Sequence, residues 1–259
     1  MAEMTSTVAV VRARKAVAAV FALSLFLLAG WLGIPPTGAS AAWAQTPSCG
    51  GKIGTLADVD TLISEPAECP GSVNGYWRAH LGAAWTQPHY VPYRNGEIPK
   101  IACADGVTDP KVFADNALYC TTDDTVAYST DFMAQLDQTG GPSYPAFVIM
   151  HELGHRGDRI GGTLGAVSRA EENQADCLAG GQARSAVDAG RLTSTDAVNG
   201  SMLFFSLGDT RGGWFDQEAS APDAHGTPMQ RAQAFDLGYQ QDISTCHRIG
   251  QSPNGSVTG

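Results

Sequence analysis

The residues best suited to chemistry lie in the segment Phe147–His155, which has the sequence Phe-Val-Ile-Met-His-Glu-Leu-Gly-His. His151 and His155 are four residues apart, so on a helix their rings project from one face and can bind one metal ion. Glu152 lies between them. In the His-Glu-x-x-His pattern the imidazoles bind zinc, and the glutamate takes a proton from the water that the metal binds. The pattern therefore predicts a hydrolase site.

The two histidines also have a simpler explanation. On an otherwise apolar helix, both rings could be partly buried and hydrogen-bonded without any metal. A catalytic zinc needs three protein ligands and one open position, so a third His, Asp, Glu or Cys must come from elsewhere in the chain. The segment 168–177 contains such residues.

A second helix is predicted to start at about Arg169, because Ser168 and Glu171 have the spacing of a capping box. This interpretation assigns Glu171 to the helix start and leaves Glu172 free to be the third ligand. Taken alone, Glu172 would be a solvated helix carboxylate, but the nearby histidine pair favours metal binding. Asp176 lies one turn further on the same face, where it can accept the second ring N–H of a ligating histidine.

These segments resemble a known family. The likeness rests on His151–His155 and Glu172–Gly180, extends to Tyr119–Tyr128 and His225–Arg231, and covers roughly residues 77–246. The family is the bacterial "putative neutral zinc metallopeptidase" family, which is similar in outline to glutamate-liganded zincins such as the CAAX-prenyl endopeptidases.

The resemblance implies one zinc ion as cofactor. The ligands that it implies are His151, His155 and Glu172. It also implies Glu152 as general base and Asp176 as hydrogen-bond partner of a ligating histidine. The chain departs from the family pattern directly after the motif, where Arg156 replaces an expected histidine. This replacement does not change a ligand, and we expect any effect of it on the cleft.

His225 is a second candidate for catalysis. Thr227, Pro228 and Gln230 have the pattern of a capped helix start, so His225 should lie just outside a rigid helix N-terminus. An imidazole placed beside an oxyanion there would stabilise it by about 3–4 kcal/mol. A loop histidine hydrogen-bonded to backbone is an equally open interpretation. For Arg231 we expect a buried ion pair.

Residues 1–44 have the pattern of a secretion signal: basic residues, an apolar run at 16–34, and then prolines and small residues. Cleavage after Ala44 or after Ala41 would fit. The alternative is an uncleaved membrane anchor formed by residues 16–34. The expected location is therefore secreted or extracytoplasmic, with membrane anchoring as the alternative.

Residues 45–250 are predicted to form one domain, followed by a disordered tail at 251–259. The chain has 16 basic and 26 acidic residues and a formal net charge of −10. Such a surface repels nucleic acid and anionic lipid, so the expected partner is a peptide or protein substrate. Membrane contact is expected only if the N-terminal segment is not cleaved.

Six cysteines follow the predicted signal, and an even number in an exported chain predicts three disulfides. They are Cys49, Cys69, Cys103, Cys120, Cys177 and Cys246. We favour the pairs Cys49–Cys69, Cys103–Cys120 and Cys177–Cys246 among those that six cysteines allow. Cys177 is a poor zinc ligand, because it lies five residues past Glu172 and points about 140° away around the helix.

The hydrophobic pattern predicts an α+β fold that is mostly helical, with a small β-sheet, and stabilised by disulfides. The resemblance implies that this fold is a zincin-like metallopeptidase domain. Strands are expected at 89–93 and 125–128. In zincins a strand edge beside the metal pairs with the extended substrate, and we expect 125–128 to provide that edge.

The sequence thus predicts an exported zinc-dependent metallopeptidase. One alternative is a zinc-holding binding or scaffold protein whose peptidase activity is lost or masked. Glu152 argues against it, as does the finding of three candidate ligands, since a structural zinc normally has four. A non-peptide amide or ester hydrolase is a further alternative, which only the family likeness disfavours.

Overall fold

The computed structural model describes residues 48–209 and 224–257. The predicted signal at 1–44 lies outside the described residues. Eight α-helices are described: α1 Leu56–Ser64, α2 Val73–Leu81, α3 Thr130–Gly140, α4 Ser143–Gly161, α5 Ser168–Asp188, α6 Ser194–Ser206, α7 Pro228–Gln240 and α8 Ile243–Gly250. The strands are β1 His89–Tyr93, β2 Ala117–Cys120 and β3 Thr125–Ser129. Short 3₁₀ turns lie at Gly82–Ala84, Ala102–Ala104 and Pro110–Phe113. The predicted mixed, mostly helical fold with a small sheet is confirmed.

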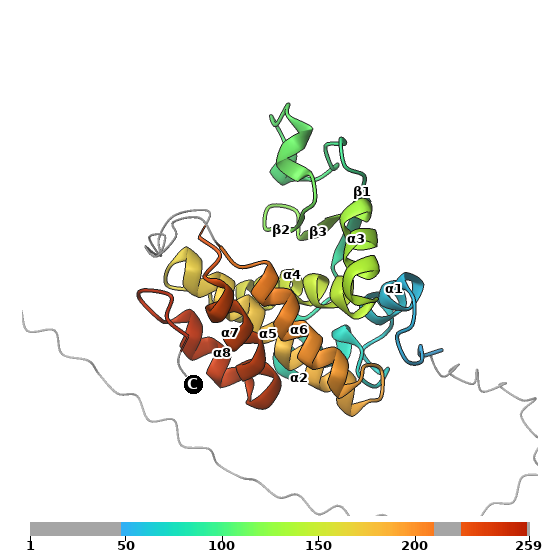
Figure 1. Cartoon of the computed structure of the whole chain (residues 1–259), viewed down its shortest axis with the longest axis vertical. Helices are drawn as coiled ribbons and strands as arrows, with labels where there is room; N and C mark the ends of the chain where they lie inside the picture. The colour runs from blue at the N-terminus through green and yellow to red at the C-terminus, as the bar shows by residue number, and fades with distance from the viewer. Residues whose placement is uncertain (1–47, 210–223, 258–259) are drawn as a thin grey trace, which may run out of the picture. The chain divides into compact units, whose positions relative to one another are not determined.

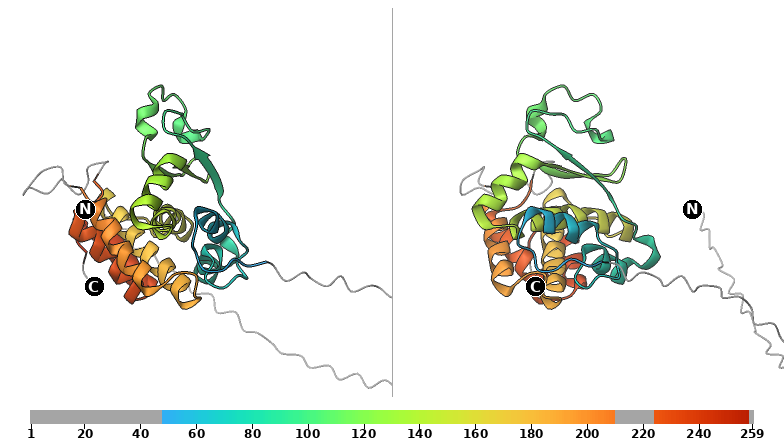
Figure 2. Two further views of the ribbon diagram at one scale, coloured as in Figure 1. Left: turned by 45° about the vertical axis from the view of Figure 1, so that its right-hand side comes forward. Right: turned by 90° about the vertical axis from the view of Figure 1, so that its right-hand side faces the viewer.

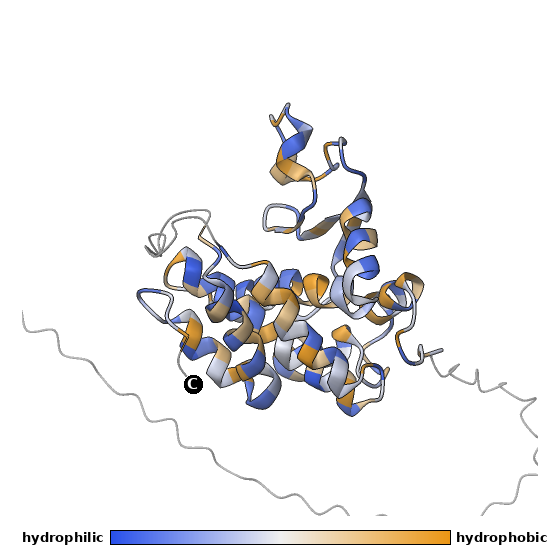
Figure 3. Ribbon diagram, in the orientation of Figure 1, coloured by the Kyte–Doolittle hydropathy of each residue, from blue (hydrophilic) through white to orange (hydrophobic). Residues whose placement is uncertain are grey.

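Helix α4 is the central element, with α5 to α8 on one side and α3 and the sheet on the other (Figure 1). Most of its residues are buried, since both of these layers pack on it. In Figure 3 hydrophobic and hydrophilic residues recur in turn along the helices, as amphipathic helices require. α4 ends at Gly162, whose φ of 70° is the left-handed conformation of a helix cap.

Small residues bring α5 close to its neighbours. A Cβ at Gly154 of α4 would lie 3.1 Å from the backbone of Ala175, and one at Gly238 of α7 would lie 1.7 Å from the carbonyl oxygen of Cys177. Ala179 and Ala183 are fully buried along the same helix. These contacts fix how α5 presents its polar residues to α4.

The three strands form one sheet in the order β1-β3-β2. β1 is parallel to β3, and β2 is antiparallel to β3. The strand predicted at 125–128 therefore exists, but the prediction that it supplies a free edge is wrong, because it is the central strand. The edge on the side of the cleft is β2, which was not predicted. Residue patterns identify strands, but strand order depends on long-range pairing.

All three expected disulfides are present at Cys49–Cys69, Cys103–Cys120 and Cys177–Cys246. Cys177–Cys246 joins α5 to α8, so the helix that carries Glu172 is tied covalently to the C-terminal segment.

The segment that the sequence places in a disordered tail is described as far as Val257. Val257 is 9% exposed and packs against the core, and the side chain of Asn173 donates to the backbone oxygen of Gly255 at 2.9 Å. Of the helices in the described part of the chain, none combines the length and the apolar character needed to cross a membrane.

Candidate metal centre

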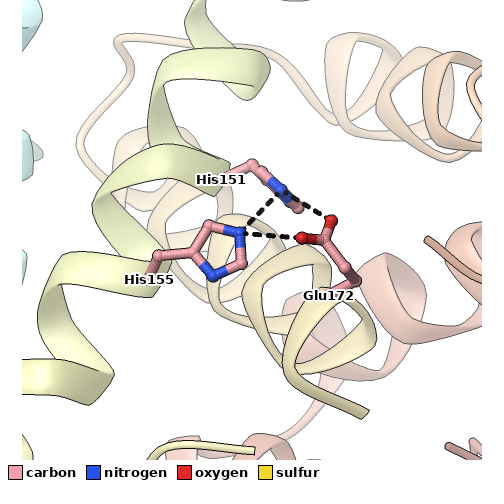
Figure 4. Close-up of side chains that lie close together, drawn as sticks. All are labelled: His151, His155 and Glu172. Carbon is pink, nitrogen blue, oxygen red and sulfur yellow. Dashed lines mark hydrogen bonds and ion pairs between the residues drawn. The ribbon is translucent and has the colours of Figure 1, made fainter. Parts of the chain in front are cut away.

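Three side chains from two helices converge at one point (Figure 4). His151 and His155 project from α4, and their Nε2 atoms lie 3.1 Å apart. Glu172 reaches them from α5, with one carboxylate oxygen 3.4 Å from Nε2 of His151 and the other 3.4 Å from Nε2 of His155. The structure thus brings together the three side chains that the sequence nominated as ligands.

The spacing of these atoms fits a zinc ion. Ligands about 2.0–2.2 Å from zinc with tetrahedral angles lie about 3.3–3.6 Å from one another. The observed separations of 3.1, 3.4 and 3.4 Å are close to this range. Oε2 of Glu172 is buried and has no hydrogen-bond partner among the described residues, which a bound cation would remedy. The residues present therefore fit the metal.

Asp176 fixes the orientation of His151. Its Oδ1 lies 2.7 Å from Nδ1 of the ring, and because a carboxylate only accepts, Nδ1 carries the proton. In the neutral ring Nε2 then presents its lone pair to the cluster. Arg231 donates to both oxygens of Asp176 at 2.8 Å, which confirms the buried ion pair expected for this arginine.

The charges of this cluster favour a cation. Burial lowers the pKa of His151, but the charges and hydrogen bonds of Asp176 and Glu172 outweigh burial and raise it to about 10. Burial raises the pKa of Glu172, but His155 and His151 outweigh burial and hold that pKa well below its ordinary value. Positive charge at the Nε2 atoms is therefore stabilised, and either a proton or a metal ion supplies it.

The predicted capping box at Ser168 and Glu171 is wrong. Val167 is the capping residue of α5, no side chain caps the helix, and Ser168 lies inside it. Glu171 instead lies with an oxygen 3.9 Å from Nδ1 of His155, and its side chain is 37% exposed. The cap differs because the helical conformation begins one residue earlier than the pattern indicated, with Val167 as the last extended residue, but the choice of Glu172 is unaffected.

The three candidate ligands His151, His155 and Glu172, called the metal cluster below, lie at a cleft of about 570 Å³. Glu152, Phe204 and Leu207 line this cleft together with the three candidate ligands. Glu152 is 7% exposed, so this carboxylate is shielded from bulk water but borders the site.

His225 lies at the same cleft, as the sequence suggested. The capped helix start behind it is present, with Thr227 and Gln230 forming a capping box. Asp209 accepts from the backbone N–H of His225 at 2.8 Å, and its other oxygen lies 3.8 Å from Nδ1 of the ring. Asp209 could not be found from the sequence, because no motif marks it and it lies sixteen residues before His225.

Residues 67–249 match the sequence profile of the family described as "Putative neutral zinc metallopeptidase". The chain belongs to this family. The family description suggests zinc, and His151, His155 and Glu172 form a candidate metal site in this chain. The resemblance inferred from the motifs is thereby confirmed over most of the described domain.

Relatives are found in bacteria. The chain is 28% identical over 193 residues to the Escherichia coli (strain K12) "Uncharacterized protein YpfJ", an alignment that covers 66% of this chain and 65% of the relative. It is 26% identical over 213 residues to the Mycobacterium tuberculosis (strain H37Rv) "Uncharacterized protein Rv2575", covering 72% of this chain and 70% of the relative. The chain thus spans about two thirds of the length of these relatives. No solved structure matches the chain.

Asp158, one turn beyond His155 on α4, gives a testable pH effect. It is 1% exposed, Thr163 donates to its Oδ1, and Nε2 of His247 is 3.9 Å away. Its Oδ2 has no hydrogen-bond partner in the described part of the chain. Burial raises its pKa from 3.8 to about 7. The folded protein thus keeps a proton that the unfolded chain releases, so the free energy of unfolding should fall as pH rises from 4 to 7.

We expect Asp158→Asn to remove this dependence. Relative to wild type, the variant should be more stable by roughly 2–4 kcal/mol at pH 8 and nearly equal at pH 4. Urea unfolding of both proteins at the two pH values measures the difference. If the difference in the free energy of unfolding between the two proteins did not change with pH, the raised pKa of Asp158 would be wrong.

Proposed function

We propose that this protein is an exported zinc-dependent metallopeptidase with a zincin-like catalytic domain. The observation that carries the proposal is the cluster of three side chains at a cleft that Glu152 also lines, with the two imidazole Nε2 atoms 3.1 Å apart and each 3.4 Å from an oxygen of Glu172. The family membership supports the same chemistry. Export is supported by the sequence pattern of residues 1–44 and by the three disulfides, which form in oxidising compartments.

His151, His155 and Glu172 would hold the metal. Zinc bound there lowers the pKa of a water molecule and polarises the carbonyl of a substrate. Glu152 accepts the proton of the attacking water and delivers it to the leaving amine. Asp176 and Arg231 keep the ring of His151 in the orientation that binding requires.

His225 is the proposed donor to the negative charge that develops on the substrate oxygen. Asp209 accepts from its backbone N–H, and both residues line the cleft. Within the cleft, a hydrogen bond from the imidazole to an oxyanion would be stronger than in bulk water.

The decisive experiment uses the chain from residue 45 onward, with its disulfides formed, and a diverse mixture of peptides. The protein carrying one zinc ion per chain should generate new peptide termini by mass spectrometry, and chelation should abolish them until zinc is restored. Zinc-loaded protein that cleaves no peptide, but hydrolyses simple esters or amides, would overturn the peptidase proposal in favour of another hydrolase. Zinc binding without any hydrolysis would support the binding-protein alternative.

A further inference from the structure

Arg156 directly follows the candidate ligand His155 on α4, but it does not line the cleft. Neighbouring helix residues point about 100° apart, so Arg156 faces a different side of α4 from His155. Its guanidinium lies over the ring of Trp85, 4.3 Å from the centroid, and donates to the backbone oxygen of Thr86 at 2.8 Å. With 1% exposure, Arg156 is held in one position.

The remaining N–H groups of Arg156 bind the turn between β2 and β3. Nε and a terminal nitrogen each lie 2.6 Å from an oxygen of Asp124, which is the two-bond geometry of a strong arginine–carboxylate pair. The hydroxyl of Tyr119 in β2 donates to the same carboxylate at 2.9 Å. Asp124 has a φ of 55°, so the turn adopts a conformation that few non-glycine residues accept.

β2 borders the cleft along most of its length. Its residues Ala117, Leu118 and Tyr119 all line the cleft, although successive side chains of a strand point to opposite faces. The strand therefore presents its edge to the cleft. Among the described residues β2 pairs with β3 alone, and the backbone groups of its outer edge have no backbone partner. Such an edge can add an extended peptide as a further strand.

Two further ties hold β2 but do not reach α4. At its start, the side chain of Asn95 donates to Asp115 at 2.6 Å and accepts from the backbone N–H of Asp115 at 3.0 Å. At its end, the disulfide Cys103–Cys120 joins it to a 3₁₀ turn in the part of the chain that projects beyond the sheet (Figure 2). The Arg156–Asp124 pair, in contrast, links the β2–β3 turn directly to the helix that carries two candidate ligands.

We propose that Arg156 and Asp124 are positioning residues that set the spacing between the edge of β2 and the metal ligands on α4. A peptide bound along β2 then presents its scissile bond at the metal cluster. This inference rests on the proposed peptidase function and specifies its substrate class: extended peptides long enough to pair with the strand. For a substrate too short to reach β2, kcat/KM should not depend on the Arg156–Asp124 pair.

The test is Asp124→Asn, with Asp123→Asn as the matched control. Asparagine accepts the left-handed conformation of Asp124 but loses the charge and one acceptor for Arg156. Asp123, the preceding residue, accepts from the backbone N–H of Ala102 and is exposed. We expect kcat/KM for a peptide of about eight residues to fall about 10–100-fold in Asp124→Asn, mainly through KM, and kcat/KM for a blocked dipeptide to stay unchanged. The control should leave both unchanged.

Hydrogen exchange of the backbone amides of residues 117–120 tests, without any substrate, whether the Arg156–Asp124 pair holds β2 in place. Faster exchange in Asp124→Asn than in Asp123→Asn is expected, and equal exchange would overturn the positioning role. An equal loss of kcat/KM for long and short substrates would also overturn it. A wild-type protein that cleaves no peptide would instead overturn the peptidase function, whatever the exchange shows. If Asp124→Asn fails to fold, Arg156→Lys should give the same split between long and short substrates, because lysine cannot form the two-bond pair.

Discussion

Glu152→Gln should retain zinc and lose peptidase turnover. The amide has the shape of the carboxylate but cannot accept a proton from water, and general acid–base catalysis of this kind contributes about 10²–10⁴-fold to a rate. Glu152 is not one of the three residues that cluster around the metal position, so zinc affinity should change little. We therefore expect kcat to fall about 10²–10⁴-fold while zinc content stays at one ion per chain.

The measurement compares wild type and Glu152→Gln on a single peptide identified from the mixture, with zinc determined in the same samples. Glu68→Gln is a suitable control, because Glu68 is exposed and lies outside the cleft. Activity in Glu152→Gln within a few-fold of wild type would show that another group takes the proton.

Glu172→Ala and Glu171→Ala should differ strongly in zinc affinity, although the residues are adjacent. Glu172 places its two oxygens 3.4 Å from the ligating nitrogens, whereas Glu171 approaches only the far nitrogen of His155, at 3.9 Å. Loss of residues that merely support ligands costs about 10–100-fold in affinity, so loss of a ligand should cost more than about 100-fold.

Competition of each variant with a chelator of known affinity at neutral pH gives the zinc affinities. Glu171→Ala should stay close to wild type, because its carboxylate is partly exposed and approaches only Nδ1 of His155, at 3.9 Å. Glu172→Gln is a further control for size, since it keeps the shape and loses the charge. If Glu171→Ala released the metal and Glu172→Ala did not, the assignment of the third ligand would be wrong.

Much of the site could be predicted from the sequence because it depends on local geometry. A spacing of four residues places His151 and His155 on one helix face in any context. The same rule places Asp176 beside Glu172, and the structure has it bonded to His151. The disulfide pairs were also predicted correctly: a short loop at Cys103–Cys120, a clip on the N-terminal arm at Cys49–Cys69, and a link from the Glu172 helix to the C-terminal segment at Cys177–Cys246.

Some hydrogen-bond partners of the site residues come from distant segments, and these could be identified only from the tertiary structure. Asp209 reaches His225 across sixteen residues, and Arg231 reaches Asp176 across 55. The sequence offered a buried ion pair for Arg231 but not the identity of its partner. Such contacts follow from how helices pack against one another, which no spacing within one helix encodes.

The same distinction explains the error in the sheet. Residues 125–129 have the apolar character of a strand, so this strand could be predicted from the sequence alone. Whether that strand lies at the centre or the edge depends on the pairing with residues 117–120 and 89–93, and on the tie from Arg156 to the turn at Asp124. Side-chain periodicity specifies which face of a strand is buried, whereas strand order is decided by non-local hydrogen bonds and packing. The sequence therefore determined the chemistry of the metal cluster, and the tertiary structure decided which strand borders it.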